Sequence, residues 1–189
     1  MRGSAEATRQ RIIQASYELF DCQGYARVSV DEIARKSGLT KRTLYYHFRS
    51  KDDLLARVLD IHRDLAIIRI HDWSDRLKGD LDTFIDAMFA DLATWASQPK
   101  WASAGFTRIV MELADMPGHP ARAIARHHKA EIEDWMTGQL TTRNVKNAAE
   151  RAQEIMLLLE GCLSLLLIHG NNKYAGTAAQ AAKVLASRS

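Results

Sequence analysis

Residues that break helices are scarce along this chain, and their scarcity limits what it can fold into. The 189 residues include only 10 glycines and 3 prolines, so long stretches run without interruption. Apolar residues in these stretches recur every three or four positions, the period of an amphipathic helix, and alternating β-branched runs are few. The pattern predicts an all-α fold, long enough for one or two domains.

The first predicted helix covers about residues 5–23 and has one buried face. Gly24 follows in a position that commonly ends a helix. Ser29 and Glu32 then fit a capping box, in which each residue bonds the backbone N–H of the other, and this box opens a short second helix. The buried face of the first helix is predicted to comprise Ile12, Ala15, Ser16, Leu19 and Phe20.

A third short helix, residues 41–48, begins directly after the Ser37-Gly38-Leu39 turn, with Thr40 as its cap. Two short helices at this spacing have the dimensions of a helix-turn-helix, which reads DNA with the N-terminal part of its second helix. Cationic and hydroxyl side chains in that part can contact guanine, thymine or phosphate. The predicted DNA-contacting residues are Thr40, Lys41, Arg42, Thr43, Tyr45, Tyr46, His47 and Lys51.

Ordinary amphipathic packing is the alternative interpretation of this third helix. We favour it for Leu44 and Phe48, an i, i+4 apolar pair, and we lean toward it for Tyr46. For the other predicted contact residues of this helix, the charge distribution along the chain supports DNA contact. Residues 1–57 hold 11 lysines and arginines against 7 acidic residues, whereas the rest of the chain has a net charge of −1.

Residues 9–55 resemble the DNA-binding head of the tetracycline-repressor (TetR) family. The most specific piece is Gly38-Leu39-Thr40-Lys41, then Thr43-Leu44-Tyr45-Tyr46-His47-Phe48, and Ser50-Lys51. The resemblance implies that Tyr45, His47 and Lys51 contact phosphates and that Lys41, Arg42 and Thr43 lie near base edges. Arg42 departs from the Gly, Ala or Pro of many members, so no operator preference carries over.

The rest of the chain is predicted to be a helical body. Ser50 can cap a long helix that starts at Lys51 and ends near Leu77. We expect a helix-turn-helix domain at residues 1–50 and an effector-binding and dimerisation domain at residues 51–189. Further helices are predicted at residues 81–97, 101–115, 121–140, 148–169 and 175–187.

One helix-turn-helix makes few base contacts, so a dimer on two half-sites is expected. The resemblance implies that the last long helices form a four-helix dimer bundle. The helix at 148–169 agrees, because its apolar residues cover more than one face. The predicted interface residues are Ile124, Ile132, Ile155, Leu159, Cys162, Leu163 and Leu166; purely intramolecular packing is the alternative.

The resemblance also implies a small-molecule site in the body. An aromatic-walled site would suit an apolar or aromatic effector, although core packing is the commoner role of such residues. Glu160 interrupts an apolar run, and we expect it to pair with Arg122 or Arg126 rather than with a ligand. The predicted lining comprises Phe84, Met88, Trp95, Trp101, Phe106, Met111, Trp135 and Glu160.

These features predict a cytoplasmic DNA-binding regulator, with repression inferred from the resemblance. Cys22 and Cys162 are predicted to be reduced core residues, and the N-terminus lacks the apolar segment of a signal peptide. No membrane span, metal site or cofactor is expected, and no catalytic motif argues for an enzyme. The alternative is an architectural or cell-division DNA-binding factor without an effector.

Overall fold

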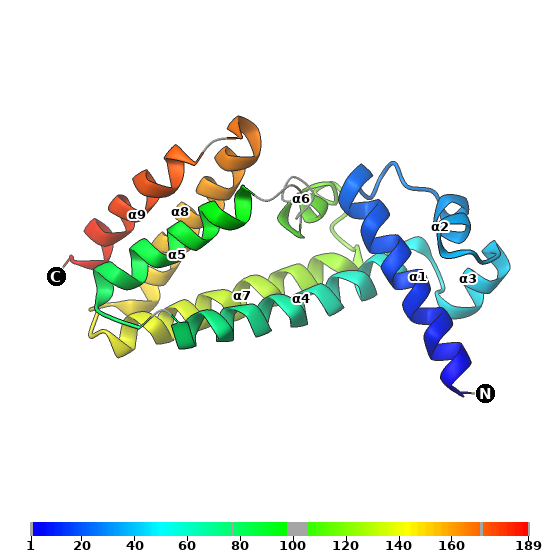
Figure 1. Cartoon of the computed structure of the whole chain (residues 1–189), viewed down its shortest axis with the longest axis horizontal. Helices are drawn as coiled ribbons and strands as arrows, with labels where there is room; N and C mark the ends of the chain where they lie inside the picture. Colours follow the sequence, from blue (N-terminus) through cyan, green and yellow to red (C-terminus); the bar gives the residue numbers. More distant parts are fainter. Residues whose placement is uncertain (1, 77, 98–105, 171, 189) are drawn as a thin grey trace. The chain divides into compact units, whose positions relative to one another are not determined.

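The computed structural model describes residues 2–76, 78–97, 106–170 and 172–188, and these form helices without any strand (Figure 1). The all-α prediction is therefore confirmed. None of the helices in these ranges is long and apolar enough to cross a membrane. The helices are α1 (Arg2–Gln23), α2 (Val30–Ser37), α3 (Lys41–His47), α4 (Lys51–Arg76), α5 (Leu81–Ala96), α6 (Phe106–Met111), α7 (Pro120–Thr142), α8 (Ala148–His169) and α9 (Lys173–Ala186).

Helix α6 differs most from its predicted extent, because it ends at Met111 rather than near residue 115. Tight turns follow it: the N–H of Leu113 donates to the carbonyl of Val110, and the N–H of Ala114 donates to that of Met111. The proline-rich stretch beyond, residues 117–120, cannot continue a helix. The predicted start of this helix, residues 101–105, lies outside the described residues.

The chain divides into two compact units. The first unit comprises residues 1–66 and 103–128, and the second comprises residues 67–102 and 129–189. The first unit thus holds the helix-turn-helix together with α6 and the start of α7. The sequence predicts a domain boundary at residue 50. Residue 50 lies at the end of the helix-turn-helix, whereas the first compact unit continues into α4.

The core of the first unit forms around the predicted face of α1, all five residues of which are buried. Ile12 and Phe20 are fully buried and pack with Ile33, Leu44 and Leu54 from the next three helices. Residues Ile109, Leu113 and Ala121 belong to the same buried cluster. The segment from α6 to α7 is therefore a structural part of the head.

The second unit packs α9 beside α5 and α8 (Figure 1). Helix α5 supplies large core side chains, among them Phe84, Ile85, Met88 and Phe89. Helix α9 supplies small ones, which let its backbone approach its neighbours closely. Its buried residues are Ala175, Ala178, Ala179, Ala182 and Ala186.

Candidate nucleic-acid interface

Helix α2 begins with the capping box predicted from the sequence. The N–H of Glu32 donates to the Ser29 hydroxyl at 3.2 Å, and the N–H of Ser29 donates to the Glu32 carboxylate at 2.8 Å. Backbone and hydroxyl donors of Ser29 lower the pKa of Glu32, because they favour its charged form. The box fixes where α2 starts, and thereby where the recognition helix follows.

The turn between α2 and α3 depends on Gly38. This residue adopts the left-handed conformation, with φ 66°, and the N–H of Leu39 donates to the carbonyl of Ala34. Arg11 of α1 donates to the carbonyl of Ser37 at 2.6 Å, and its guanidinium lies 3.0 Å from where a Cβ on Gly38 would stand. Sequence reasoning missed Arg11, because its contact joins residues 26 positions apart.

Helix α3 is oriented by its two apolar side chains. Leu44 is fully buried and Phe48, its C-cap, is 2% exposed, as predicted. At the other end the N–H of Thr43 donates to the hydroxyl of Thr40, which confirms the predicted cap. The outward side presents Thr40, Lys41, Arg42, Tyr45 and Tyr46 as exposed residues and Thr43 and His47 as half-buried ones.

Tyr46 is 83% exposed, so the inference that it is half-buried packing is wrong. Its ring contacts that of the neighbouring His47, with 5.2 Å between the centroids. The i, i+4 pair of Leu44 and Phe48 points inward, and a residue two positions from each on a helix faces away. A fully accessible tyrosine at this site is free to meet a nucleic acid.

Two of the predicted cations have partners within the protein. Lys41 forms an ion pair with Asp31 of α2 at 3.1 Å. Lys51 donates to the carbonyls of Tyr25 and Val28, both at 2.8 Å, and lies 4.1 Å from the Tyr25 ring centroid. Burial lowers the pKa of Lys51 despite the nearby acidic groups. Two of its three N–H donors are thus used, and the third can point outward.

Arg9 of α1 is a further cation beside the recognition helix, 5.1 Å from the Phe48 ring centroid. It was not among the predicted contact residues, although it opens the segment that carries the family resemblance. Taken together, α3 offers a capped helix end with cationic, hydroxyl and aromatic groups outward. This is the side-chain set that duplex DNA recognition uses.

The sequence profile described as "Bacterial regulatory proteins, tetR family" matches residues 12–58 of this chain. This segment of the head is therefore similar to the tetR family. The match ends within α4, so it covers the helix-turn-helix and the helices that support it. The family resemblance predicted from the sequence is therefore confirmed.

Curated relatives resemble the same tetR-family head. The HTH-type transcriptional regulator SrpR of Pseudomonas putida is 49% identical over 55 residues, which cover 29% of this chain and 26% of SrpR. An HTH-type transcriptional regulator of Staphylococcus aureus is 42% identical over 71 residues, 38% of this chain and 37% of that protein. The matched segments thus span well under half the length of these relatives.

Solved structures extend the likeness to the body of this chain, as a likeness of fold. A TetR-family transcriptional regulator from Streptomyces coelicolor, SCO4454, superposes with a TM-score of 0.81 at 19% identity, covering 95% of this chain and 94% of that one. Reduced E. coli NemR gives a TM-score of 0.79 at 17% identity, covering 95% and 97%.

The predicted dimer residues lie on two different faces of α7 and α8. Ile155, Cys162 and Leu166 are at most 3% exposed and pack inside their own unit, so they are not available to a partner chain. The helical period identifies an apolar face but not which of two faces turns inward. The remaining predicted interface residues, Ile124, Ile132, Leu159 and Leu163, are half-buried.

The predicted effector residues are dispersed over both units. Phe84 and Met88 are core residues of α5, and the Phe84 ring lies 6.0 Å from that of Trp135. Met111 is 71% exposed and belongs to the first unit. Trp95 is half-buried, whereas Trp101 and the side chain of Phe106 lie outside the described residues.

Glu160 is predicted from the sequence to pair with Arg122 or Arg126. It accepts a hydrogen bond from Lys129 of α7 at 2.5 Å, which ties α8 to α7 within the second unit. Lys129 lies three residues beyond Arg126, almost one helical turn along the same helix.

Proposed function

We propose that this protein is a homodimeric transcriptional regulator that binds a palindromic duplex operator through α3. The observation that carries the proposal is the orientation of that helix. Its apolar pair, Leu44 and Phe48, turns inward, and its cationic and aromatic residues turn outward. Since the N-terminal end of a recognition helix meets base edges, these outward residues would lie in the major groove.

Within this proposal the contact residues divide into two classes. Lys41, Arg42 and Thr43 read base edges, because they lie at the N-terminal end of α3. The others, which fix the register of the protein on the duplex, contact phosphates; they are Thr40, Tyr45, Tyr46, His47 and the remaining donor of Lys51.

Alanine at position 41 or 42 separates these classes. If the lysine or arginine reads a guanine, we expect Lys41→Ala or Arg42→Ala to cost about 1–3 kcal/mol and to relax preference at one base position. Competition binding against a set of single-base operator variants measures this. An equal loss on every sequence would assign the residue to a phosphate instead.

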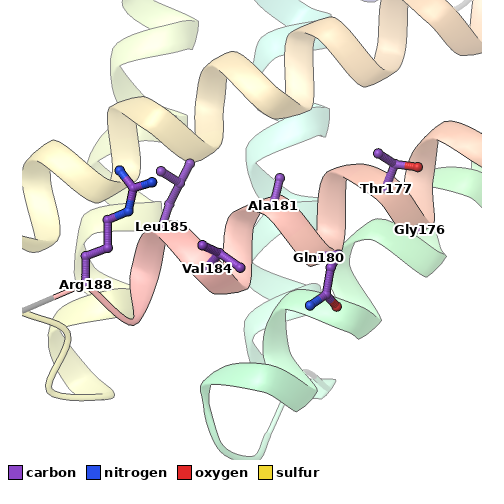
Figure 2. A pocket seen from close by; sticks show the side chains of 7 residues that line it. All are labelled: Gly176, Thr177, Gln180, Ala181, Val184, Leu185 and Arg188. Carbon is purple, nitrogen blue, oxygen red and sulfur yellow. The ribbon is translucent and has the colours of Figure 1, made fainter.

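We propose that the second copy of this chain docks on α8 and α9. Leu157 and Ile168 of α8 are 75% and 71% exposed, and Val184 of α9 is 50% exposed. Figure 2 shows residues along α9 that line a shallow groove, where small side chains would permit close helix contact. These lining residues are Gly176, Thr177, Gln180, Ala181, Val184, Leu185 and Arg188.

We further propose that a small apolar or aromatic molecule bound in the body weakens operator binding. This repressor hypothesis rests on the family resemblance and on the aromatic side chains of the second unit, such as Trp95 and Trp135. Linkage requires the effector to bind the DNA-free state more tightly by the factor with which it weakens DNA binding. A thermal-shift screen, followed by operator titration with each hit, tests it.

An architectural or cell-division factor without an effector is the alternative within the DNA-binding class. It would share the head and the operator but would show no thermal shift with any compound. Deleting the gene would then alter cell or nucleoid shape and leave neighbouring promoters unchanged. Altered transcription of a neighbouring gene together with an operator in its promoter would instead favour the regulator.

A further inference from the structure

A segment far away in sequence contacts the two connections that join α2 and α3 to the rest of the chain. These connections are the loop of residues 24–29 before α2 and the start of α4 after α3. The contacting segment is residues 109–121, and its Leu113 and Ala121 are fully buried in the head core. Two polar side chains of this segment, Glu112 and His119, reach the two connections.

Glu112 contacts the loop before α2. Its carboxylate accepts the backbone N–H of Ala26 at 3.0 Å, a contact across 86 residues of sequence. A Cβ on Gly24 would stand 2.5 Å from the same carboxylate, and Gly24 has φ +85°. The positive φ favours glycine at this position, and a larger residue would also displace the Glu112 carboxylate.

His119 contacts the start of α4 from the opposite end of the segment. Its Nδ1 accepts the N–H of Ala121 at 3.1 Å and so caps α7, which begins with Pro120. An Nδ1 that accepts a bond carries no proton, so the neutral ring carries its proton on Nε2. That buried Nε2 lies 3.6 Å from the Asp52 carboxylate and has no hydrogen-bond partner among the described residues.

Tyr25 and Lys51 link these two contacts into one cluster. The Tyr25 hydroxyl donates to the same Asp52 oxygen that His119 faces, and the two rings meet edge to face with 5.5 Å between centroids. Lys51 donates to the carbonyls of Tyr25 and Val28. We call Tyr25, Lys51, Asp52, Glu112 and His119 the head anchor.

We propose that Glu112 and His119 are positioning residues for DNA binding, although neither lies on α3. By holding loop 24–29 and the first turn of α4, they fix the orientation of the recognition helix against residues 109–121. Without them the recognition helix samples other orientations relative to residues 109–121, and the apparent dissociation constant rises by the inverse of the fraction that remains competent. This inference rests on the proposed DNA-binding function.

Two pairs of variants separate positioning from simple stabilisation. Glu112→Ala removes the acceptor for Ala26, whereas Glu112→Gln retains an acceptor oxygen. His119→Ala removes both ring contacts, whereas His119→Asn can still cap α7 but lacks the group that faces Asp52. The control is Asp86→Ala, which breaks an ion pair with Lys183 between α5 and α9 in the second unit.

The readouts are operator affinity, its salt dependence, and the thermal midpoint of each variant. We expect Glu112→Ala, His119→Ala and His119→Asn to bind about tenfold more weakly, a size typical of coupling between distant sites, with an unchanged salt slope. Glu112→Gln and Asp86→Ala should bind like the wild type, and His119→Asn should recover the thermal midpoint lost in His119→Ala.

Wild-type affinity in Glu112→Ala and His119→Asn, measured well below their thermal midpoints, would overturn the inference and leave the anchor a stabilising contact only. A reduced salt slope in either variant would also overturn it, because a lost phosphate contact would then explain the weaker binding. If the wild-type protein itself selects no DNA sequence, the proposed function fails, and this inference falls with it.

Discussion

At the scale of single residues, the cations of the head serve the protein as well as a nucleic acid. Lys41 is paired with Asp31 and Lys51 is bonded to two carbonyls, so each has an internal partner before DNA arrives. An internal partner holds the side chain in one place, which lowers the entropy lost on binding. The internal partner also competes with the DNA for the cation. Which effect is larger, the lower entropy loss or the competition, can be measured.

Asp31 is expected to oppose DNA binding. Asp31→Asn removes a negative charge close to the DNA-facing side and releases Lys41, so affinity for any duplex should rise a few-fold at low salt. Both partners are largely exposed, and exposed pairs contribute only about 0–1 kcal/mol, so stability should change little. Anisotropy titrations at two salt concentrations test this. Weaker binding would instead indicate that Asp31 holds Lys41 in its reading position.

Lys51→Ala should have two separable consequences. The carbonyls of Tyr25 and Val28 lose their donor, so the free energy of unfolding should fall by about 1–3 kcal/mol. If the third donor meets a phosphate, the salt slope of DNA binding should also fall by about one. Urea unfolding and salt-dependent titration measure the two effects independently. A lower stability with an unchanged salt slope would mean that Lys51 stabilises the head anchor and does not contact a phosphate.

At the scale of helices, the local signals were sufficient to predict most of the architecture. Ser29, Thr40 and Ser50 each cap the helix predicted to follow them, because capping depends only on side chains and N–H groups within three residues. Helix α8 has its predicted bounds, residues 148–169. Arg11, Glu112 and His119 could not be predicted, since their partners become neighbours only after folding.

The capping box of α2 should therefore contribute measurable stability. Ser29→Ala removes the hydroxyl that accepts the N–H of Glu32, and loss of such a cap costs about 1 kcal/mol. Chemical denaturation should show this decrease, and Ser29→Asp, which retains an acceptor, should show little of it. If the free energy of unfolding fell equally in the two variants, the Ser29 hydroxyl would not stabilise the protein by capping α2.

At the scale of the whole molecule, the sequence did not distinguish the inward from the outward apolar face of α8. Leu157 and Ile168 are exposed, whereas the predicted Ile155 and Leu166 are buried within the chain. Both faces are apolar, so periodicity alone cannot decide between them. The effector site is harder still to predict, because a cavity depends on how several helices pack together.

The proposed dimer is tested by charge introduced on the outward face. Leu157→Glu or Val184→Glu should convert the proposed dimer to a monomer of 21.3 kDa and abolish tight operator binding, because a buried unpaired carboxylate is costly. Light scattering after size exclusion measures the mass. Met111→Glu is the matched control, since Met111 is similarly exposed but lies in the first unit. A dimeric Leu157→Glu, Val184→Glu double variant would place the interface elsewhere.

The central claim is that α3 reads a specific duplex sequence, and one titration tests it most directly. DNA enriched from a random pool is labelled, and its fluorescence anisotropy is followed against protein concentration at several salt concentrations. We expect an enriched palindrome with half-sites about 34–36 Å apart, bound tightly by one dimer and far more tightly than scrambled DNA. Weak, salt-sensitive binding with no enriched sequence would contradict it.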